Sequence, residues 1–283
     1  MIHGKPACRS WQVCGREHDH SRFKGNLLTD LRPNPSPNLV RIVAIETSGR
    51  MGSVAVGFGP QLLAEKQFTA GMNHAIELMP TLRDLTLAQG WQPRQIQHVY
   101  LSIGPGSFTG LRIAVMVARS LAQAIGCLVV AVPALDVLAA NAPAEASHLA
   151  VILDAKRGQV YAARYRRDES AAADAGGWQC TTGPILTSPE EFVRQSPKPL
   201  YVLGEGVDYH RAALRAGVDA DEDLIELGRE TWIARATAVH QLGWAMAGRG
   251  IFADVTSLVP LYIRLPEAQE LWNRRHGSSA NAL

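Results

Sequence analysis

The chain has 283 residues, of which 47% are hydrophobic and 19% charged, with a formal net charge of +2. This composition is typical of a folded globular protein and excludes a disordered or fibrous chain. The length is sufficient for one large domain or for two lobes, each with its own core. The four cysteines show neither disulfide nor zinc spacing, which favours a reducing, cytoplasmic location.

The positive charge is concentrated at the N-terminus. Residues 1–39 hold six Lys and Arg but three Asp and Glu, which leaves 22 basic and 23 acidic residues in the remainder. A nearly neutral body argues against tight binding of a polyanion by this chain alone. No stretch reaches the roughly 20 uncharged apolar residues of a membrane span, and no signal peptide is visible. We therefore expect no membrane contact.

Both ends of the sequence differ from the middle. Residues 1–39 mix Gly, Pro, Asn, Arg and His without periodicity, so we expect a disordered N-terminal extension. A metal site in this extension is disfavoured, because its two cysteines lie at an unusual spacing for zinc. Residues 266–283 are expected to form a polar C-terminal tail.

One pattern occurs twice in the chain. Residues 40–46 read as a strand that ends in an acid, followed by a turn and a second strand at 53–58; residues 149–154 and 159–166 repeat this order. A third strand is expected at 62–68. The repeat predicts a duplicated α/β fold of two lobes, 40–140 and 141–265, with a cleft between the two acidic turns.

A glycine-rich turn at residues 104–110 connects an apolar strand to a long helix, 109–125. Such an arrangement can bind phosphate, because the backbone N–H groups of the turn and of the helix N-terminus place partial positive charges around the same point. However, Leu111 and Arg112 stand where a Walker loop needs Lys and Ser or Thr, and Thr109 occupies the third glycine position of the dinucleotide fingerprint. We therefore interpret the turn as a tight strand-to-helix joint.

In two helices of the first lobe the apolar residues cover more of the circumference than the single stripe of an ordinary surface helix. The helix 74–89 contains Pro80, which is expected to kink it or delay its start, and the helix 109–125 has a single narrow polar strip. Such helices need cover on most sides, either from their own lobe or from a partner; the sequence favours neither. Further elements are expected as strands at 129–132, 178–182 and 200–203, helices at 134–140, 188–195, 209–216 and 231–248, and an extended segment at 258–264.

Catalytic chemistry is hard to find in the sequence. There is no G-x-S-x-G elbow, and no two histidines of the body lie three or four residues apart, so no catalytic residue or metal ligand is assigned. The turns at strand ends supply only weak candidates for nucleotide or phosphate contacts: Glu46, Thr47, Ser48, Gly104, Gly106, Ser107, Asp154 and Gly204.

Five stretches carry a resemblance to a known family: IVAIETS, NHAIELMPTL, GPGSFTGLRI, DAKRGQVYAARY and VPLYIR. Together they resemble the bacterial TsaB family, also called YeaZ, over about residues 40–264. The resemblance implies an actin-like, Hsp70-like ATPase (ASKHA) fold of two related lobes. It also implies a non-catalytic subunit for threonylcarbamoylation of the adenosine next to the anticodon, in tRNAs that read codons beginning with A.

The resemblance further implies partners. A TsaB-like protein pairs with a TsaD-like catalytic subunit, or with itself when TsaD is absent, and works with a TsaE-like ATPase; tRNA is met indirectly. ATP and Mg²⁺ are used by the complex, and no cofactor is assigned to this chain. Mapped onto the two helices, the partner interface is expected at Ile76, Met79, Leu82, Arg83, Arg112, Ala114, Val115, Ala118, Arg119 and Ala122.

One residue departs from the family pattern, because the first strand ends in Glu46 instead of Asp. The longer side chain changes where Mg²⁺ could sit and argues against nucleotide chemistry in this lobe. The alternative hypothesis is an actin-fold ATPase or a glycoprotease-like hydrolase with its own activity, based on the two acidic turns and the glycine loop.

Overall fold

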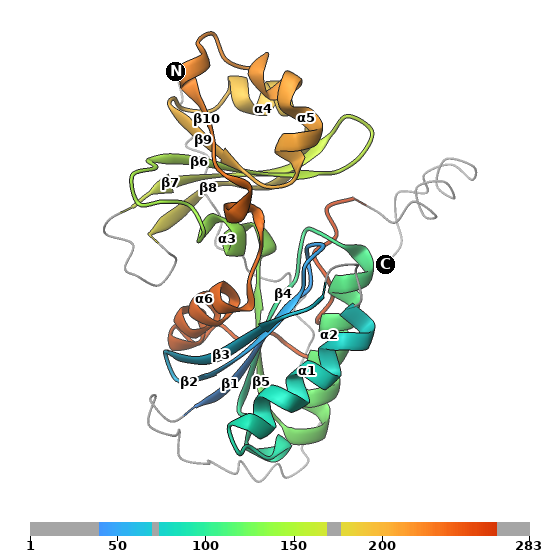
Figure 1. Cartoon of the computed structure of the whole chain (residues 1–283). Helices are drawn as coiled ribbons and strands as arrows, with labels where there is room; N and C mark the ends of the chain where they lie inside the picture. The colour runs from blue at the N-terminus through green and yellow to red at the C-terminus, as the bar shows by residue number, and fades with distance from the viewer. Residues whose placement is uncertain (1–39, 70–73, 169–176, 265–283) are drawn as a thin grey trace, which may run out of the picture.

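The computed structural model describes residues 40–69, 74–168 and 177–264. These residues form two lobes, each built on a five-stranded sheet, that lie one above the other in Figure 1. The expectations for residues 1–39 and 266–283 fall outside the described residues.

The first sheet has the strand order β3-β2-β1-β4-β5. Its first three strands form an antiparallel meander, and β4 and β5 then pair parallel to β1. Because β1 is central and covered on both faces, five of its six residues are fully buried. The strands are β1 (Arg41–Glu46), β2 (Ser53–Phe58), β3 (Gln61–Gln67), β4 (His98–Ser102) and β5 (Leu128–Val132).

The second sheet repeats this arrangement with the order β8-β7-β6-β9-β10. The first three strands are again antiparallel, and the last two again add in parallel beside the first. The repeat of strand order and direction confirms the predicted duplicated α/β fold. The strands are β6 (His148–Asp154), β7 (Val160–Arg167), β8 (Trp178–Thr187), β9 (Leu200–Leu203) and β10 (Leu224–Glu226).

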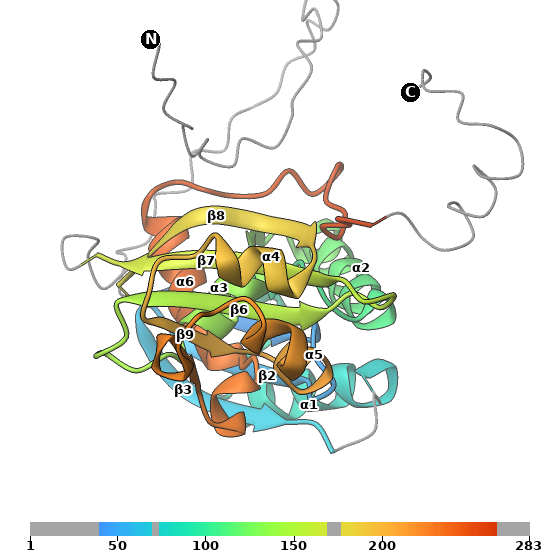
Figure 2. The same cartoon turned by 90° about the horizontal axis from the view of Figure 1, so that it is seen from above.

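Helices cover the outer face of each sheet. In the first lobe α1 packs on β2 and β3, and α2 packs on β4 and β5. In the second lobe α5 packs on β6 and β9 and α4 packs on α5, as seen from above in Figure 2. The bounds are α1 (His74–Ala88), α2 (Phe108–Ile125), α4 (Pro189–Arg194) and α5 (Gly206–Arg215).

The two remaining helices are exchanged between the lobes. The helix α3 (Ala134–Ala139) follows the last strand of the first sheet but packs on β6, β7 and β8, whereas α6 (Ala236–Gly248) follows the second sheet and packs on β1, β2, β4 and β5. They also contact each other, so they fill the space between the sheets in Figure 1. The expected lobe ranges 40–140 and 141–265 follow the order of the chain, and each of these two helices packs on the sheet of the other range.

Several element boundaries differ from the expected ones for local reasons. The helix α1 begins at His74 and continues through Pro80. The cap of α2 is Ser107, whose hydroxyl accepts a hydrogen bond of 3.2 Å from the Gly110 amide, so the helix begins before Thr109. The expected helix 231–248 starts at Ala236, after a short 3-10 turn.

The helix α2 is, in the described part of the chain, the one helix long and apolar enough by composition to cross a membrane. One such helix is weak support for a membrane protein, since a core helix passes the same test. The inner face of α2 packs into the core between the helices and the first sheet, beside Val43, Ile45 and Leu101. Its apolar character therefore has a packing explanation on that side.

Candidate functional site

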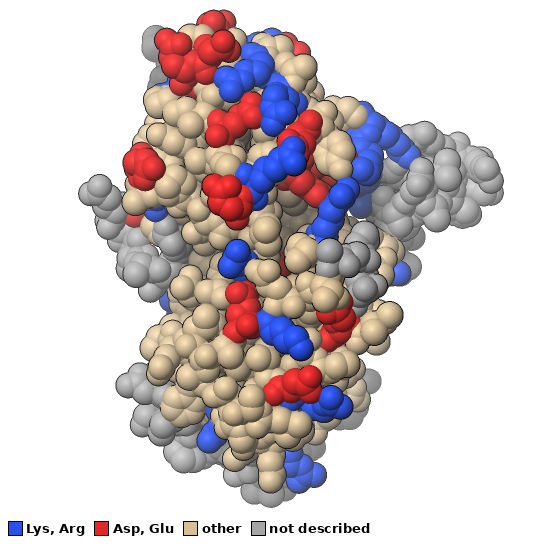
Figure 3. All heavy atoms as spheres, viewed as in Figure 1, with Lys and Arg blue, Asp and Glu red and all other residues tan. Residues whose placement is uncertain are grey.

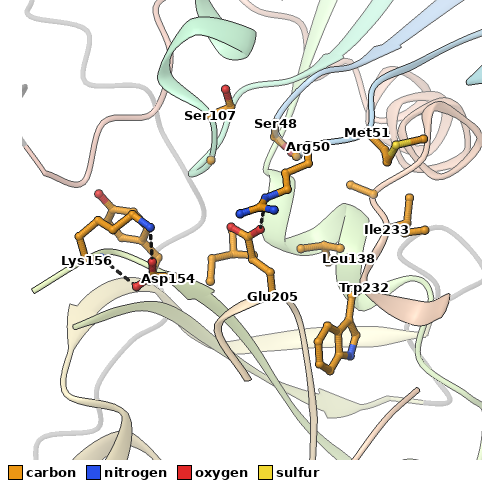
Figure 4. A pocket seen from close by; sticks show the side chains of 15 residues that line it. Ser48, Arg50, Met51, Ser107, Leu138, Asp154, Lys156, Glu205, Trp232 and Ile233 are labelled. Carbon is orange, nitrogen blue, oxygen red and sulfur yellow. Dashed lines mark hydrogen bonds and ion pairs between the residues drawn. The ribbon is translucent and has the colours of Figure 1, made fainter. Parts of the chain in front are cut away.

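A pocket of about 350 Å³ lies between the two lobes. The first lobe contributes the ends of the two turns that follow β1 and β4, and the second lobe contributes the turn after β6 and the loops around Glu205 and Trp232. One end is polar and the other apolar, as the side chains in Figure 4 show. The polar end holds Arg50, Ser107, Asp154, Lys156 and Glu205, and the apolar end holds Met51, Leu138, Trp232 and Ile233.

The glycine-rich turn packs directly against the backbone of the turn after β1. The Ser107 amide donates a hydrogen bond of 2.7 Å to the Ser48 carbonyl. A Cβ on Gly106 would lie 2.4 Å from that same carbonyl oxygen, and one on Gly110 would lie 2.0 Å from the carbonyl oxygen of Thr47. These glycines are required because two backbones approach closely. The turn therefore acts as the strand-to-helix joint that the missing Walker residues indicated.

The carboxylate at the end of β6, that of Asp154, is bound by two side chains of the same lobe. The Asp154 carboxylate accepts a hydrogen bond of 2.7 Å from the Lys156 ammonium and lies 3.0 Å from His210 Nε2. Partial burial acts to raise the pKa of Asp154, but the hydrogen bonds from Lys156 and His210 outweigh it and hold that pKa below its ordinary value. A carboxylate held in this way has little capacity left for a cation.

The acid at the end of β1 is buried. Glu46 has no exposed surface, and its Oε1 accepts a hydrogen bond of 2.5 Å from the Ser48 amide. Burial raises the pKa of Glu46, against the opposing effect of the hydrogen bonds from Ser48. Glu46 therefore fixes the turn after β1 from within the core.

The structure divides the eight predicted nucleotide or phosphate contacts into two groups. Four of them line the pocket: Ser48, Gly106, Ser107 and Asp154. The other four are buried beside it and do not line it: Glu46, Thr47, Gly104 and Gly204. Among residues 40–69, 74–168 and 177–264, no group of three or more His, Cys, Asp or Glu side chains is arranged to hold a metal ion.

A pair of charged residues bridges the mouth of the pocket. Arg50, from the first lobe, lies 3.9 Å from the carboxylate of Glu205 and donates a hydrogen bond of 2.9 Å to the hydroxyl of Tyr209, both in the second lobe. Figure 4 shows Arg50 and Glu205 pointing toward each other. Both charges are well exposed to solvent, so this ion pair contributes little to stability.

The outer surface of α1 and α2 is the second candidate site. Four of the ten predicted interface residues are exposed there: Ile76, Met79, Arg83 and Arg112. Ile76 has 74% of its surface exposed, a large fraction for an isoleucine, and Met116 on α2 has 62%. In Figure 3 acidic and basic side chains are spread more thinly over the lower lobe than over the upper lobe.

Four predicted interface residues belong instead to the core. Leu82, Ala114, Val115 and Ala118 are buried where α1 and α2 pack on the first sheet. An apolar helix pattern does not reveal which of its faces meets the sheet, and the small alanines permit close approach of α2 to the strands. In the folded chain these four side chains are therefore covered by the first sheet, and their contact with a partner stays a prediction.

The exposed Arg112 and one further predicted residue, Arg119, form hydrogen bonds within the chain itself. Arg112 donates a hydrogen bond of 3.0 Å to the hydroxyl of Tyr262, and Arg119 donates to the carbonyl oxygens of Thr256 and Leu258. Ala122 is half-buried beside the core. The polar strip of α2 thus binds the C-terminal part of the chain, which the sequence showed only as an extended apolar segment.

The sequence analysis missed exposed apolar side chains on the same two helices. Leu87 on α1 and Met116 on α2 are exposed. Phe108, at the start of α2, is also exposed, and the Arg112 guanidinium lies 4.2 Å from its ring centroid. Their helical spacing from Ile76 and Arg112 was a signal that could have identified them.

Comparisons with known proteins identify relatives of this chain. The family model described as TsaD, tRNA N6-adenosine threonylcarbamoyltransferase, matches residues 67–189. The tRNA threonylcarbamoyladenosine biosynthesis protein TsaB of Bacillus subtilis is 30% identical over 234 residues, which cover 82% of this chain and 97% of that relative. The protein of the same name from Escherichia coli is 31% identical over 153 residues, 53% of this chain and 64% of that relative.

Solved structures are similar as well. The structure described as YeaZ from Pseudomonas aeruginosa aligns with a TM-score of 0.65 and 25% identity, over 78% of this chain and all of that chain. A second Pseudomonas aeruginosa structure, described as similar to peptidase YEAZ, aligns with a TM-score of 0.66 at 24% identity. These similarities and the duplicated sheets confirm the expected actin-like architecture.

Proposed function

The chain belongs to the TsaB family of tRNA threonylcarbamoyladenosine biosynthesis proteins, and from this premise we propose that it is the non-catalytic, activating subunit of the modifying complex. In this role it pairs with a TsaD-like catalytic subunit through the outer surface of α1 and α2. The reaction is threonylcarbamoylation of the adenosine next to the anticodon, in tRNAs that read codons beginning with A.

The observation that carries this proposal is the apolar surface left uncovered on α1 and α2. Ile76, Met79 and Leu87 on α1 and Met116 on α2 are exposed although their helices are packed on the other side. Exposed apolar side chains on two helices that contact each other favour a protein partner, and their desolvation supplies the free energy of association. We propose that the same surface pairs two copies of this chain when the partner is absent.

The state of the two strand-end acids supports a non-catalytic role. Asp154 is held by Lys156 and His210, and Glu46 is buried with a raised pKa. An enzyme that uses Mg²⁺ and a nucleotide needs carboxylates that are charged and open to the cation. We propose that ATP and Mg²⁺ are used by the other members of the complex, including a TsaE-like ATPase, in the cytoplasm, and that tRNA is met indirectly.

The test combines reconstituted tRNA modification with a binding measurement. Ile76→Asp places a charge in the exposed surface of α1, and we expect it to weaken association with the TsaD-like subunit at least tenfold, because an unpaired charge would be desolvated at the interface. Ile185→Asp on β8 is the matched control, since Ile185 is also exposed but lies in the other lobe.

Three outcomes decide the proposal. Loss of binding and of tRNA modification with Ile76→Asp, but not with Ile185→Asp, supports it. Wild-type binding by Ile76→Asp rejects the surface. Full tRNA modification in the absence of the chain rejects the activating role.

The alternative, an actin-fold ATPase or hydrolase, makes a different prediction. In that case the purified chain turns over ATP without partners, and Asp154→Ala abolishes the turnover. We expect no turnover by the chain alone, because its strand-end acids are not available to a metal ion. Turnover that Asp154→Ala removes would replace the proposed role with an enzymatic one.

A further inference from the structure

Residues 251–264, called here the C-terminal strap, run from the end of α6 along the first lobe. The Ala253 amide donates a hydrogen bond of 2.8 Å to the Val129 carbonyl of β5, and the Leu261 amide donates one of 2.7 Å to the Ile103 carbonyl after β4. The strap therefore lies against the edge of the first sheet, where β5 has no further strand beside it.

Two arginines of α2 attach the strap to that helix. Arg119 donates hydrogen bonds to the carbonyl oxygens of Thr256 and Leu258, at 3.2 and 3.4 Å. Arg112 donates one of 3.0 Å to the hydroxyl of Tyr262. Because these two side chains lie on one strip of α2, they fix the path of the strap over most of its length.

The last residue of the strap reaches the other lobe. Arg264 donates a hydrogen bond of 2.5 Å to the Ala155 carbonyl and a second one to Gln159 Oε1. Both acceptors belong to the turn between β6 and β7. The strap thus joins the helix α2 of the first lobe to a turn of the second lobe that lines the pocket.

That turn has an unusual backbone. Lys156 and Arg157 both adopt left-handed conformations, with φ of 63° and 55°, and Gly158 follows with 72°. A left-handed conformation is unfavourable for residues with a Cβ and persists only when neighbouring contacts hold it in place. Hydrogen bonds within the turn, from the Ala155 amide to the Gln159 carbonyl and from the Gln159 amide to the Lys156 carbonyl, contribute to holding it. Asp154, which accepts from the Lys156 amide, and Arg264 add contacts from outside these bonds.

We propose that the C-terminal strap is a tie between the lobes, with Arg264 as the positioning residue that holds the left-handed turn. Arg112 and Arg119 fix the strap to α2, and the strap places Arg264 on Ala155 and Gln159. The turn between β6 and β7 then sets the positions of Asp154 and Lys156 in the pocket wall. Movement of the strap on α2 is therefore transmitted to the pocket.

The tie does not depend on the proposed function, because every contact in it lies within one chain. It adds a consequence to that function. A partner that docks on α2 contacts the helix to which the strap is attached, so docking changes the geometry of the pocket. The experiment is therefore done on the purified chain without a partner, where the tie can fail independently of the proposed function.

Amide hydrogen exchange, followed by mass spectrometry, tests the end of the tie. Arg264→Ala is expected to speed exchange in the turn 154–159 at least tenfold, while Arg264→Lys, which keeps the charge but loses the forked geometry, gives a smaller increase. Arg166→Ala is the matched control, because Arg166 is an exposed arginine of β7 bonded to Gln179 within its own lobe. Wild-type exchange in Arg264→Ala would overturn the proposal.

A double-mutant cycle tests the transmission. Arg119→Ala alone is expected to speed exchange in the turn about threefold, although Arg119 contacts no residue of that turn, and to add nothing in the Arg264→Ala background. An unchanged turn in Arg119→Ala, or an equal increase in both backgrounds, would overturn the tie. If Arg119→Ala also exposes β1 and β4, Tyr262→Phe takes its place, because it removes only the hydroxyl through which Arg112 holds the strap.

Discussion

The Tyr165 hydroxyl donates a hydrogen bond of 2.7 Å to Asp136 and thereby joins β7 to α3. The pair lies beside a small cavity of about 80 Å³ that Trp178, Cys180 and Leu242 also line. The helix α3 follows β5, the last strand of the first sheet, but packs on the second sheet. This hydrogen bond therefore attaches the segment that leaves the first lobe to the second sheet. Its strength therefore affects how firmly the lobes are joined.

The first prediction concerns the pH dependence of stability at Asp136. Burial raises the pKa of Asp136 to about 6, against the opposing effect of the hydrogen bond from Tyr165. The folded state thus binds the Asp136 proton more tightly than the unfolded chain does. The contribution of this proton to the free energy of unfolding is complete below pH 4 and is lost as the pH rises through about 6. The loss amounts to at most about 3 kcal/mol.

Asp136→Asn should remove this dependence, because an amide keeps the acceptor for Tyr165 and does not ionise. Urea unfolding of both proteins between pH 4 and 7 gives the difference in the free energy of unfolding. We expect the variant to gain stability relative to wild type as the pH rises. A difference that stays constant over this range would contradict the assigned pKa.

The second prediction concerns Glu46, the acid at the end of β1. Its pKa is raised by burial, so wild-type stability falls as the pH rises from the ordinary pKa of a glutamate through the raised value. Glu46→Gln keeps the size and the acceptor for the Ser48 amide but removes the charge. We expect the variant to be at least as stable as wild type at pH 7, measured by thermal unfolding, whereas Glu46→Ala is destabilised by the cavity it leaves.

The third prediction tests the contact between β2 and the exchanged helix α6. A Cβ on Gly57 would lie 2.1 Å from Nε2 of His240, whose ring is fully buried. Gly57→Ala is therefore expected to cost about 1–3 kcal/mol in the free energy of unfolding, as overpacking does. Gly248→Ala is the control, since a Cβ there meets nothing within 4 Å.

The cause of that cost can be separated by adding His240→Ala. Removal of the ring destabilises the protein by itself but leaves room for the new methyl group, so Gly57→Ala should cost at least about 1 kcal/mol less in the His240→Ala background. Additive effects of the two changes would mean that the cost comes from the β2 backbone and not from the ring.

The parts of the fold that sequence predicted well are local. The strand, glycine turn and helix at residues 98–125 follow from apolar runs and turn glycines that lie within one short stretch, and only the helix start, capped by Ser107, differs from the expected one. The repeat of an acid after β1 and β6 likewise predicted two equivalent sheets. Each of these signals depends on residues that are neighbours in the chain.

The parts that sequence did not predict depend on contacts between distant segments. The packing of α3 on the second sheet and of α6 on the first depends on contacts between distant parts of the chain. The sequence of neither helix indicates on which sheet it packs. In the same way Ala114 and Ala118 are as apolar as the exposed Met116, and only the fold shows which side of α2 meets the strands. The role of Arg112 was hidden because its partner, Tyr262, lies 150 positions further along the chain.

The last prediction separates the core face of α2 from its surface face. Ala118→Arg forces a charged side chain into the packed space against the first sheet, where Ala118 is fully buried, and should cost several kcal/mol and prevent stable folding. Met116→Arg places the same residue two positions earlier, where the side chain is 62% exposed, and should shift the melting temperature by no more than a few degrees. The folded Met116→Arg variant is then expected to lose association with the TsaD-like subunit, measured by titration calorimetry. Equal melting temperatures for the two variants would contradict the orientation of α2, and unchanged association of Met116→Arg would exclude Met116 from the docking surface.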